Sequence, residues 1–498
     1  MNLVQRAARW ALDRRHVGYA GALAVGLIGL LTARSSLVVL AGVVFALVTV
    51  VWAWEFQTKA LRRQVTDRER LARVQADVRR LANHLDHQKV VHEQLAAVAE
   101  QSRAAAERAA WTGAAQPTGR SGRPHVLFVT SNGSGMGHLT RLLAVARAGE
   151  DLFESSFVSL STAAEVVTQF GFPCVRVASQ GRTGLSWPEW NTRFARFMRS
   201  HLDSVRPDAV VFDGIQVFRG VHESAHDAGI PLVWVARGLW KDGVPRDQMR
   251  RWRDIAALVL VPTERPLVAD ETAVPLTDGG LVPVDPIVFV RPAERLDRSA
   301  AIERLGLEPD KRHVLVQLGS GALASRAELE KAAVEAVRAL GPEWAPALFR
   351  SPLAQGSDDD VPADTRVLRE YPMATLMAAF EFSVTSAGYN TVHENLRYAQ
   401  PAIYVPDRNM LADDQGLRAA SVVKAGVGIV AESATDLAHA VESLSREEQR
   451  LTMARRAAEI RGTDGAVSAA QAIAEAITDR TVAGLAYDVY EPMRTESK

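Results

Sequence analysis

Residues 124–148, PHVLFVTSNGSGMGHLTRLLAVARA, decide the fold of this chain. The stretch begins with a short apolar and β-branched run, Pro124 to Thr130, and ends with apolar residues at helical spacing from Leu139 to Ala148. Between the two runs lies a loop made of Ser131, Asn132, Gly133, Ser134, Gly135, Met136, Gly137 and His138. Its glycines let the backbone turn sharply and approach a ligand closely, and the N–H groups of the following helix are free to face an anion. The stretch therefore predicts a phosphate or diphosphate site in an α/β domain.

This loop differs from the two best-known phosphate-binding loops. A dinucleotide fold requires G-x-G-x-x-G and an acidic residue about 20 residues later, at the end of the second strand. Here the third glycine comes early, and the next strand candidate, Ser156 to Thr162, ends in hydroxyl residues. No Gly-Lys-Ser/Thr follows, so the Walker pattern is also absent. A tight turn without a ligand remains an alternative, but His138 at a helix start is a candidate catalytic base.

Length and composition limit the classes of protein to consider. With 498 residues, of which 47% are hydrophobic, the chain is long enough for about three domains with sizeable cores. Lys plus Arg and Asp plus Glu number 58 each, so the charge balance does not indicate a nucleic-acid partner. Cys174 is the single cysteine, which excludes an intramolecular disulfide framework and a multi-cysteine zinc site. A single cysteine suits a reducing compartment.

The N-terminal part has the composition of a membrane anchor. We expect residues 1–16 to be a cytoplasmic N-terminus and residues 17–54 a transmembrane helical hairpin, because two apolar runs meet at Arg34–Ser35–Ser36 and each is close to the 17–25 residues that cross a bilayer. A re-entrant hairpin is the alternative. Basic residues flank both ends of the hairpin: Arg6, Arg9, Arg14 and Arg15 before it, Lys59, Arg62 and Arg63 after it. This bias predicts a multi-pass protein of the cell membrane with its catalytic domains on the cytoplasmic side.

A helical spacer and a linker follow. Residues 55–111 are rich in Ala, Arg, Glu and Gln without proline or glycine, which predicts a long helix or a weak coiled coil. The apolar heptad pattern is lost after Leu85, so a homodimer through residues 61–99 and a plain spacer both stay open. Residues 112–123 read as a flexible linker.

Residues 124–285 alternate strand and helix patterns, as expected for a Rossmann-like domain with a parallel sheet. Asp213 follows the strand candidate DAVVFDG, and residues just past strand carboxyl ends line the ligand crevice of such sheets. Asp213 is therefore a catalytic candidate, with an Asx-type turn before Gly214 as the alternative. The aromatic and arginine-rich segment 186–201 suggests either contact with a membrane or lipid acceptor, or an aromatic face that packs on its own domain.

Residues 286–462 form a second Rossmann-like unit, and residues 463–498 are expected to hold a helix that crosses back onto the first domain, followed by a tail. A proline-rich stretch around Gly279–Gly280 to Arg295 is the expected crossover between the two α/β units. Two units joined in this way imply a cleft, where small ligands usually bind. Within the second unit, Ser386 to Glu394 (SAGYNTVHE) is a strand end, a glycine turn and a helix start. Gly388 and the N–H groups after it suit a diphosphate, and the Glu394 carboxylate can accept hydrogen bonds from a ribose diol. Asp413–Asp414–Gln415 supplies polar groups suited to sugar hydroxyls.

These motifs resemble those of the GT-B glycosyltransferases of family 28, whose members include a peptidoglycan N-acetylglucosaminyltransferase that acts on a lipid-linked acceptor. The resemblance covers residues 124 to about 480 and implies two Rossmann-like domains facing across a cleft, here preceded by the membrane hairpin and the long helix. Gly388, Thr391 and Glu394 match the donor motif S-x-G-x-x-T-x-x-E, and Gly137–His138 resembles the Gly-Gly-His loop. Leu318 replaces the first glycine of the Gly-Gly-Ser-x-Gly-Ala turn, and Arg418 stands where the family often has asparagine.

The resemblance implies an inverting transfer from a nucleotide sugar, typically a UDP-sugar, to a lipid-linked or glycan acceptor, without a cofactor or metal. It assigns the donor diphosphate to Gly319, Ser320, Gly321, Gly388, Tyr389, Asn390 and Thr391. Glu394 would hold the ribose, and Asp414 and Gln415 the sugar. The acceptor-side loop would comprise Ser131, Asn132, Gly133, Gly135 and Gly137. His138 would act as general base or stabilise the leaving diphosphate.

Two other functions share these features. A nucleotide-sugar 2-epimerase of GT-B shape would have the same donor pocket but no use for a membrane hairpin. A membrane-tethered scaffold with a degenerate transferase body would have no reason to keep Glu394 and Gln415 together. Arg237 and Lys241, in the segment ARGLWKDG, would either meet an acceptor phosphate or lie on the solvated surface.

Overall fold

The structure is a computed structural model that describes residues 26–28, 30, 39–58, 122–131, 136–266, 280–319, 324–350, 361–362, 365–410 and 412–478. The chain divides into two compact units, residues 1–92 and 93–498. The predicted long helix or coiled coil apart from residues 55–58, the linker apart from its last two residues, and the C-terminal tail beyond Thr478 lie outside the described residues.

The first unit contains one described helix that is long and apolar enough to cross a membrane, judged by length and composition alone. It runs from Val39 to Thr58, with a mean hydropathy of 2.1 over its most apolar window, and its large apolar side chains are exposed. A Cβ atom on Gly26 would lie 3.3 Å from the Cβ of Ala41, so this part of the first predicted arm lies against the helix. Most of that first arm lies outside the described residues.

The N-terminal domain of the second unit is built on a parallel sheet. In the described part of the chain this sheet has the strand order β3-β2-β1-β4-β5-β6-β7, and every neighbouring pair is parallel. The strands are β1 (His125–Thr130), β2 (Glu154–Ser159), β3 (Cys174–Arg176), β4 (Ala209–Asp213), β5 (Leu232–Val235), β6 (Leu258–Pro262) and β7 (Leu281–Val284). The helices and 3₁₀ turns are α4 (Gly137–Ala148), α5 (Ala164–Gln169), η1 (Gln180–Arg182), α6 (Trp187–Val205), α7 (Arg219–Asp227), α8 (Asp247–Arg250) and η2 (Trp252–Asp254).

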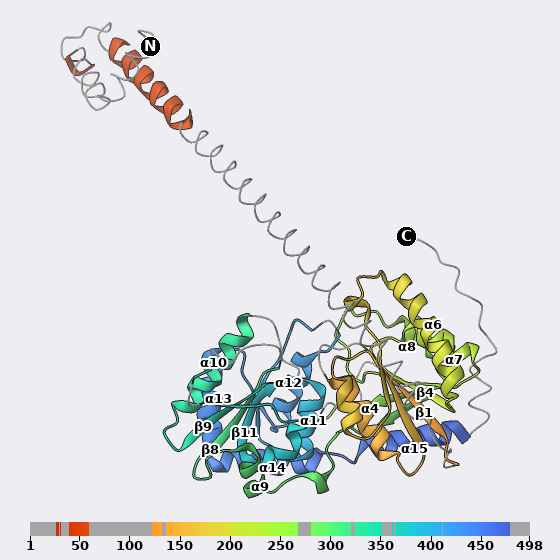
Figure 1. Ribbon diagram of the computed structural model, residues 1–498. Helices are drawn as coiled ribbons and strands as arrows, with labels where there is room; N and C mark the ends of the chain where they lie inside the picture. Colours follow the sequence, from red (N-terminus) through yellow and green to blue (C-terminus); the bar gives the residue numbers. More distant parts are fainter. Residues whose placement is uncertain are drawn as a thin grey trace. The chain divides into compact units, whose positions relative to one another are not determined.

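The C-terminal domain repeats the plan with the order β10-β9-β8-β11-β12-β13, again all parallel among the described strands. Its strands are β8 (Arg312–Gln317), β9 (Trp344–Phe349), β10 (Arg366–Leu368), β11 (Phe380–Ser386), β12 (Ala402–Val405) and β13 (Ile429–Val430). Its helices and 3₁₀ turns are η4 (Pro292–Glu294), α9 (Arg298–Leu305), α10 (Ala324–Arg338), η5 (Met373–Ala379), α11 (Tyr389–Arg397), α12 (Gln415–Lys424), α13 (Ala434–Ser445) and α14 (Glu447–Ile460). The predicted α/β class with two parallel-sheet domains is confirmed (Figure 1).

Alternating apolar residues explain how helices cover both faces of the first sheet. Val126 and Phe128 of β1 pack with α4, whereas Leu127 and Val129 pack with α6. Because successive side chains of a strand point to opposite faces, a strand that is apolar at every position is buried on both. A last helix, α15 (Gly465–Thr478), returns from the C-terminal domain and adds five buried residues to the cluster that contains α4, namely Ala466, Ala469, Ala470, Ile473 and Ala476.

One segment differs from the expectation drawn from the sequence, and for a second segment the structure decides between the two alternatives left open. The proline-containing stretch after Gly280 was expected to be the crossover, yet residues 281–284 form strand β7, which pairs with β6. Pro283 is tolerated there because β7 is the edge strand, where a missing N–H breaks no ladder. In α6, Trp190 and Phe194 are buried against the sheet, so its aromatic face packs on its own domain and only Trp187, 51% exposed, faces solvent.

Each sheet has a point where the strand order reverses. In the first sheet this point lies between β1 and β4, and in the second it lies between β8 and β11. Ligands of open α/β sheets bind outside the carboxyl ends of the strands at such a point. The loops after β1, β4, β8 and β11 are therefore where a site is expected.

Candidate active site

The carboxyl ends of β1 and β4 bring His138 and Asp213 together. His138 is the second residue of α4, and its Nδ1 lies 2.7 Å from Oδ1 of Asp213, the last residue of β4. Arg141, one helical turn after His138, donates to the same carboxylate, from Nε to Oδ2 over 2.8 Å and from Nη2 to Oδ1 over 2.5 Å. The sequence named His138 and Asp213 separately, and the structure makes them one group with Arg141.

The protonation of this group follows from its partners. Burial alone would raise the pKa of Asp213, but the Arg141 guanidinium and His138 more than offset it and hold this pKa below its usual value. The ionised carboxylate accepts, so Nδ1 of His138 carries the hydrogen and donates to Asp213. The 3.2 Å approach of Arg141 Nη2 to the same Nδ1 is then a contact between two donors that share one acceptor. Nε2 of His138 has no hydrogen-bond partner among the described residues, and the side chain is 19% exposed, so this nitrogen is open to a ligand.

Asp213 itself touches no solvent. Its side chain is fully buried, and both of its carboxylate oxygens are used by His138 and Arg141. Asp213 can therefore reach a ligand only through the side chain of His138. Its backbone carbonyl accepts from the N–H of Ser131 over 3.0 Å, which holds the first residue of the glycine loop at the same place.

The rest of the predicted acceptor-side loop is only partly described. Asn132, Gly133 and Gly135 lie outside the described residues, as do Ser320 and Gly321 of the second glycine turn. Gly319 lies two residues after the carboxyl end of β8 and has a φ of +85°, a left-handed conformation that favours glycine. Its place at the strand reversal agrees with a role beside the donor, and the buried side chain of Leu318 explains how the first glycine of the turn can be replaced.

The donor motif begins the helix α11 after β11. Gly388 is the N-cap residue, and no side chain caps the helix. The first N–H groups of α11, from Tyr389, Asn390 and Thr391, therefore remain for an anion, which the helix dipole also favours. Asn390 reaches across the domain boundary, with Nδ2 3.4 Å from the carbonyl oxygen of Gly137. Since α4 also begins without a side-chain cap, two uncapped helix N-termini meet where the strands of both sheets end.

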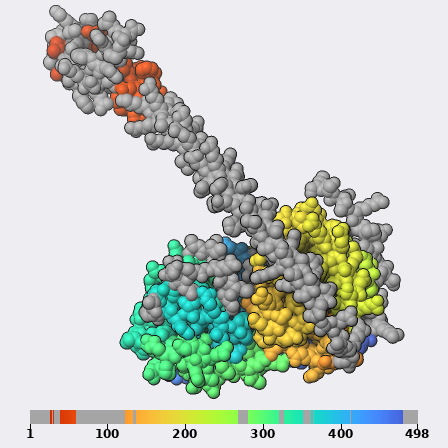
Figure 2. All heavy atoms as spheres, in the orientation of Figure 1, coloured from red at the N-terminus to blue at the C-terminus, as the bar shows by residue number. Residues whose placement is uncertain are grey.

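Space-filling atoms show the same boundary from outside. In Figure 2 the orange atoms of the N-terminal domain lie directly beside the cyan atoms of the C-terminal domain. A second bond across the boundary joins the hydroxyls of Thr140 in α4 and Tyr371 over 2.9 Å. The two domains are thus joined at a second point besides the Asn390 contact.

Glu394 is a carboxylate without a protein partner. No hydrogen bond or ion pair joins it to another described residue, and burial raises its pKa to about 7. A half-buried, desolvated carboxylate is costly unless something binds it. A ligand with two adjacent hydroxyls, such as a ribose, would supply the missing donors.

Tyr389 has a structural role beside its place in the motif. Its ring lies under the guanidinium groups of Arg141, at 5.1 Å, and Arg418, at 5.9 Å, and its hydroxyl accepts from the N–H of Ile287 over 3.2 Å. Thr391 is half-buried in the same first turn of α11, and no described residue bonds its hydroxyl. Of the motif residues, Thr391 and the backbone of α11 are thus better placed to meet a ligand than the Tyr389 side chain.

The two predicted sugar-binding residues shape the loop before α12. Asp414 caps α12 by accepting from the N–H of Leu417 over 2.8 Å. Gln415 is buried, and its Oε1 accepts from the N–H of Asp407 over 2.9 Å, which closes the loop on itself. The remaining carboxylate oxygen of Asp414 and amide nitrogen of Gln415 are the groups that a sugar could use.

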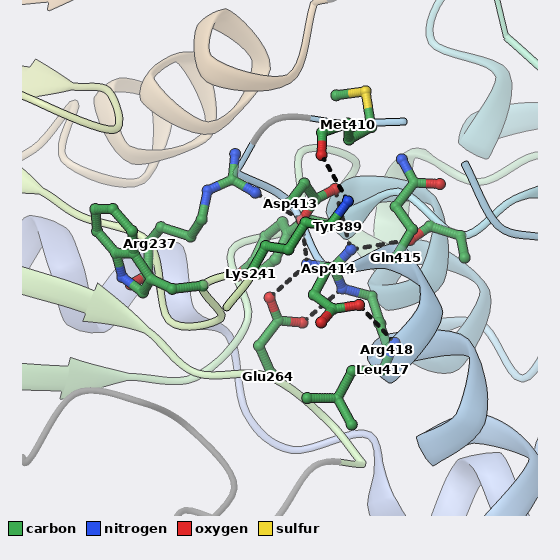
Figure 3. A network of polar contacts seen from close by, with 12 residues as sticks. Arg237, Lys241, Glu264, Tyr389, Met410, Asp413, Asp414, Gln415, Leu417 and Arg418 are labelled. Carbon is green, nitrogen blue, oxygen red and sulfur yellow. Dashed lines mark hydrogen bonds and ion pairs between the residues drawn. The ribbon is translucent and has the colours of Figure 1, made fainter. Parts of the chain in front are cut away.

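A buried ion-pair network at the domain boundary was not foreseen from the sequence (Figure 3). Arg418, in α12, is fully buried and donates to both oxygens of Glu264, which follows β6, over 2.8 and 2.7 Å. It also bonds Asp413, over 3.2 and 2.8 Å, and the carbonyl of Ala387 over 2.9 Å. Burial would lower the pKa of Arg418, but Glu264 and Asp413 raise it well above its usual value. The arginine that replaces the family's asparagine thus joins the two domains.

Arg237 and Lys241 lie neither in a free acceptor site nor on a fully solvated surface. Arg237 Nη1 donates to Asp413 Oδ1 over 2.6 Å, and burial together with the nearby Arg141 and Arg418 lowers its pKa. Burial would raise the pKa of Asp413, but its two arginines bring it down to about 2. Lys241 Nζ donates to the carbonyl of Arg408 over 2.7 Å. Both side chains therefore reach from the N-terminal domain onto the loop after β12 (Figure 3).

The comparisons with known proteins agree with this geometry. The glycosyltransferase family 28 C-terminal domain matches residues 357–475, which include α11, Glu394 and the Asp414–Gln415 pair. This match and the two-domain fold support a glycosyltransferase. A comparison with curated protein sequences finds no match.

Solved structures show that the family 28 domain here is part of a complete GT-B fold. The kitacinnamycin glycotransferase is similar with a TM-score of 0.50 and 19% identity, over 71% of this chain and 99% of that one. CalG4, the calicheamicin glycosyltransferase, gives a TM-score of 0.51 and 17% identity, over 72% and 99% of the two chains. A protein assigned as UDP-N-acetylglucosamine 2-epimerase from Listeria monocytogenes gives 0.52 and 14%, over 72% and 97%. At these identities the likeness shows the fold, which transferases and an epimerase share.

Proposed function

We propose that this protein is a membrane-anchored, inverting glycosyltransferase that moves a sugar from a nucleotide sugar, most simply a UDP-sugar, to a lipid-linked or membrane-proximal glycan acceptor. The observation that carries the proposal is the position of His138. Its Nδ1–H donates to the buried Asp213. Its helix, α4, begins beside the uncapped N-terminus of α11, because Asn390 of α11 contacts the carbonyl oxygen of Gly137. A base and an anion site therefore face one cleft.

The chemistry follows from these positions. His138 Nε2 accepts the proton of an acceptor hydroxyl as that oxygen bonds the anomeric carbon of the sugar. The bond from this carbon to the phosphate oxygen breaks on the opposite face, so the configuration inverts and the electron pair leaves with the nucleoside diphosphate. The N–H groups at the start of α11 and the helix dipole stabilise the charge that develops on the diphosphate. Glu394 binds the ribose, and Asp414 and Gln415 contact the transferred sugar.

The membrane part of the proposal rests on the Val39–Thr58 helix and on the basic residues that flank the two apolar runs. A hairpin of residues 17–54 would keep the catalytic domains on the cytoplasmic side, near acceptors carried by lipids. Residues 61–99 would serve as a spacer or as a homodimer contact. Neither a nucleic-acid partner nor a cofactor is part of the proposal.

Donor binding is the first test. A chain that begins near Gly119 should bind UDP-sugars in a calorimetric titration, and Glu394→Ala should abolish that binding. Glu370→Ala, a change of an exposed carboxylate on the same domain, is the matched control and should bind as the unaltered chain does. If the unaltered chain binds no nucleotide sugar, the transferase proposal is wrong.

A 2-epimerase is the second candidate, because the assigned epimerase from Listeria monocytogenes has the same fold. Membranes that contain the full chain would be incubated with radiolabelled nucleotide sugars and then extracted for lipid. Label in the lipid fraction that disappears with His138→Ala supports transfer. A changed sugar nucleotide that forms without any acceptor supports epimerisation instead.

A further inference from the structure

The loop after β12 carries the residues that would contact the sugar. We call residues 406–410 and 412–414 the sugar-side loop. Its base is fixed from within the C-terminal domain, because Gln415 accepts from the N–H of Asp407 and Asp407 accepts from the N–H of Asn409 over 3.0 Å. The middle of the loop carries backbone carbonyls that need hydrogen-bond donors from outside the loop.

Those partners come from one residue of the other domain. Lys241 Nζ donates to the carbonyls of Arg408 and Met410, over 2.7 and 3.3 Å, and the Lys241 backbone N–H donates to the carbonyl of Ala412 over 3.1 Å (Figure 3). Three alternate carbonyls of the sugar-side loop are thus bonded by a single lysine. Hydrogen bonds from a charged ammonium are about twice as strong as neutral ones. Lys241 therefore determines the course of this loop.

The end of the loop is held by the same domain. Asp413 is buried between Arg237 of the N-terminal domain, at 2.6 Å, and Arg418 of its own domain, at 2.8 Å. The next two residues along the chain are Asp414 and Gln415. Because a covalent neighbour fixes where they begin, the backbone position of both residues depends on the contacts that Lys241 and Arg237 make with this loop.

From this arrangement we infer that Lys241, supported by Arg237, is a specificity-determining positioning residue for the donor sugar. The N-terminal domain completes the sugar pocket of the C-terminal domain, whereas the diphosphate and ribose groups are assigned to α11, Glu394 and the turn at Gly319. The inference rests on the proposed function, since it concerns the sugar part of the donor. Removing the Lys241 ammonium should weaken binding of the sugar and leave binding of the nucleotide unchanged.

The test compares two ligands on one set of variants. Dissociation constants for UDP and for UDP-N-acetylglucosamine or UDP-glucose, whichever the unaltered chain binds more tightly, are measured by calorimetry. Lys241→Met, which keeps most of the aliphatic stem, should bind UDP within twofold of the unaltered chain and bind the UDP-sugar at least tenfold more weakly. Lys241→Arg, which can donate to two carbonyls, should recover most of the loss. Lys331→Met, on the exposed face of α10, is the matched control and should change neither constant.

Hydrogen exchange gives a second measurement on the unliganded protein. Peptides that cover residues 402–418 should exchange faster in Lys241→Met and at the original rate in Lys331→Met. Equal weakening of UDP and UDP-sugar, or an unchanged ratio of the two constants, overturns the inference while leaving the proposed function intact. If the unaltered chain binds neither ligand, the proposed function fails and the inference fails with it.

Discussion

Glu264 and Arg418 form a two-bond ion pair between the domains, and neither side chain is exposed to solvent. Both charges lost their hydration when the domains came together, so each depends on the other. Removing one partner of such a pair leaves a buried charge without compensation, which costs about 3–5 kcal/mol.

The first prediction concerns this pair. Arg418→Met should lower the free energy of unfolding by about 3–5 kcal/mol, because the buried carboxylates of Glu264 and Asp413 would lose their arginine partner. Glu264→Leu should cost less, since Arg418 keeps Asp413, and the double variant should recover part of the loss of Arg418→Met. Urea unfolding measures all three. Arg304→Met removes an exposed pair with Glu370 and should cost less than about 1 kcal/mol; equal effects at both sites would contradict the buried pair.

A second prediction concerns the orientation of His138. In Asp213→Asn the amide can present its NH₂ group to Nδ1, which moves the imidazole hydrogen to Nε2 and removes the base. The turnover number should fall by about 10³–10⁴-fold, with the dissociation constant of the nucleotide sugar changed less than threefold. Steady-state kinetics and calorimetry on the same samples separate the two quantities. Asp247→Asn, at an exposed position, should leave both unchanged; full activity in Asp213→Asn would show that His138 needs no positioning by Asp213.

A third prediction follows from the pKa of Glu394, about 7 against an ordinary 4.5. The folded protein holds this proton more tightly than the unfolded chain, so the ionised carboxylate destabilises the unliganded protein fully above pH 7, and this cost disappears as the pH falls toward 4.5. Glu394→Gln should therefore raise the free energy of unfolding by about 1–3 kcal/mol at pH 8, with a smaller gain at pH 5. Thermal unfolding across this range measures the difference.

The same titration should appear in donor binding. Only the ionised Glu394 accepts two hydrogen bonds from a ribose, so the affinity for a nucleotide sugar should decrease as the pH falls through about 7. Glu394→Gln should bind weakly at every pH between 6 and 8. The variant would thus be more stable and less able to bind. A pH-independent affinity in the unaltered chain would exclude Glu394 from the donor site.

A fourth prediction concerns Gly465, the first residue of α15. A Cβ atom there would lie 1.7 Å from the carbonyl oxygen of Asp285, at the crossover between the domains. Gly465→Ala must move one of the two backbones and should cost about 1–3 kcal/mol of stability. Gly181→Ala, which meets no atom within 4 Å, is the matched control and should be close to neutral. Unfolding curves that coincide for the two variants would contradict the close contact.

Local patterns were sufficient to predict the two α/β domains. The apolar runs of β1 and β11 and the glycine turns after them are contained within short segments, and the spacing of Gly388, Thr391 and Glu394 needs no knowledge of the rest of the chain. The pairing of His138 with Asp213 follows from the parallel sheet, because β1 and β4 are neighbours that end at the same edge.

Local sequence patterns could not predict contacts between residues that are far apart in the chain. Glu264 and Arg418 are 154 positions apart, and nothing near either residue indicates the other. Lys241 and the carbonyls of the sugar-side loop leave no pattern in the sequence either, since backbone groups are the same at every residue. Strand β7 was missed for a different reason: Pro283 argued against a strand, and the edge position that permits it becomes visible only in the assembled sheet.

Helix α15 has a consequence for the order in which the chain can fold. Its five buried residues complete the core on the α4 side of the first sheet, although they are translated after the entire second domain. During translation, the α4 side of the first sheet therefore stays uncovered until residue 478 has emerged from the ribosome. A stop codon placed before Gly465 would leave an intact second sheet but an incomplete first one, so we expect nascent chains of that length to need a chaperone and full-length chains to be released from it.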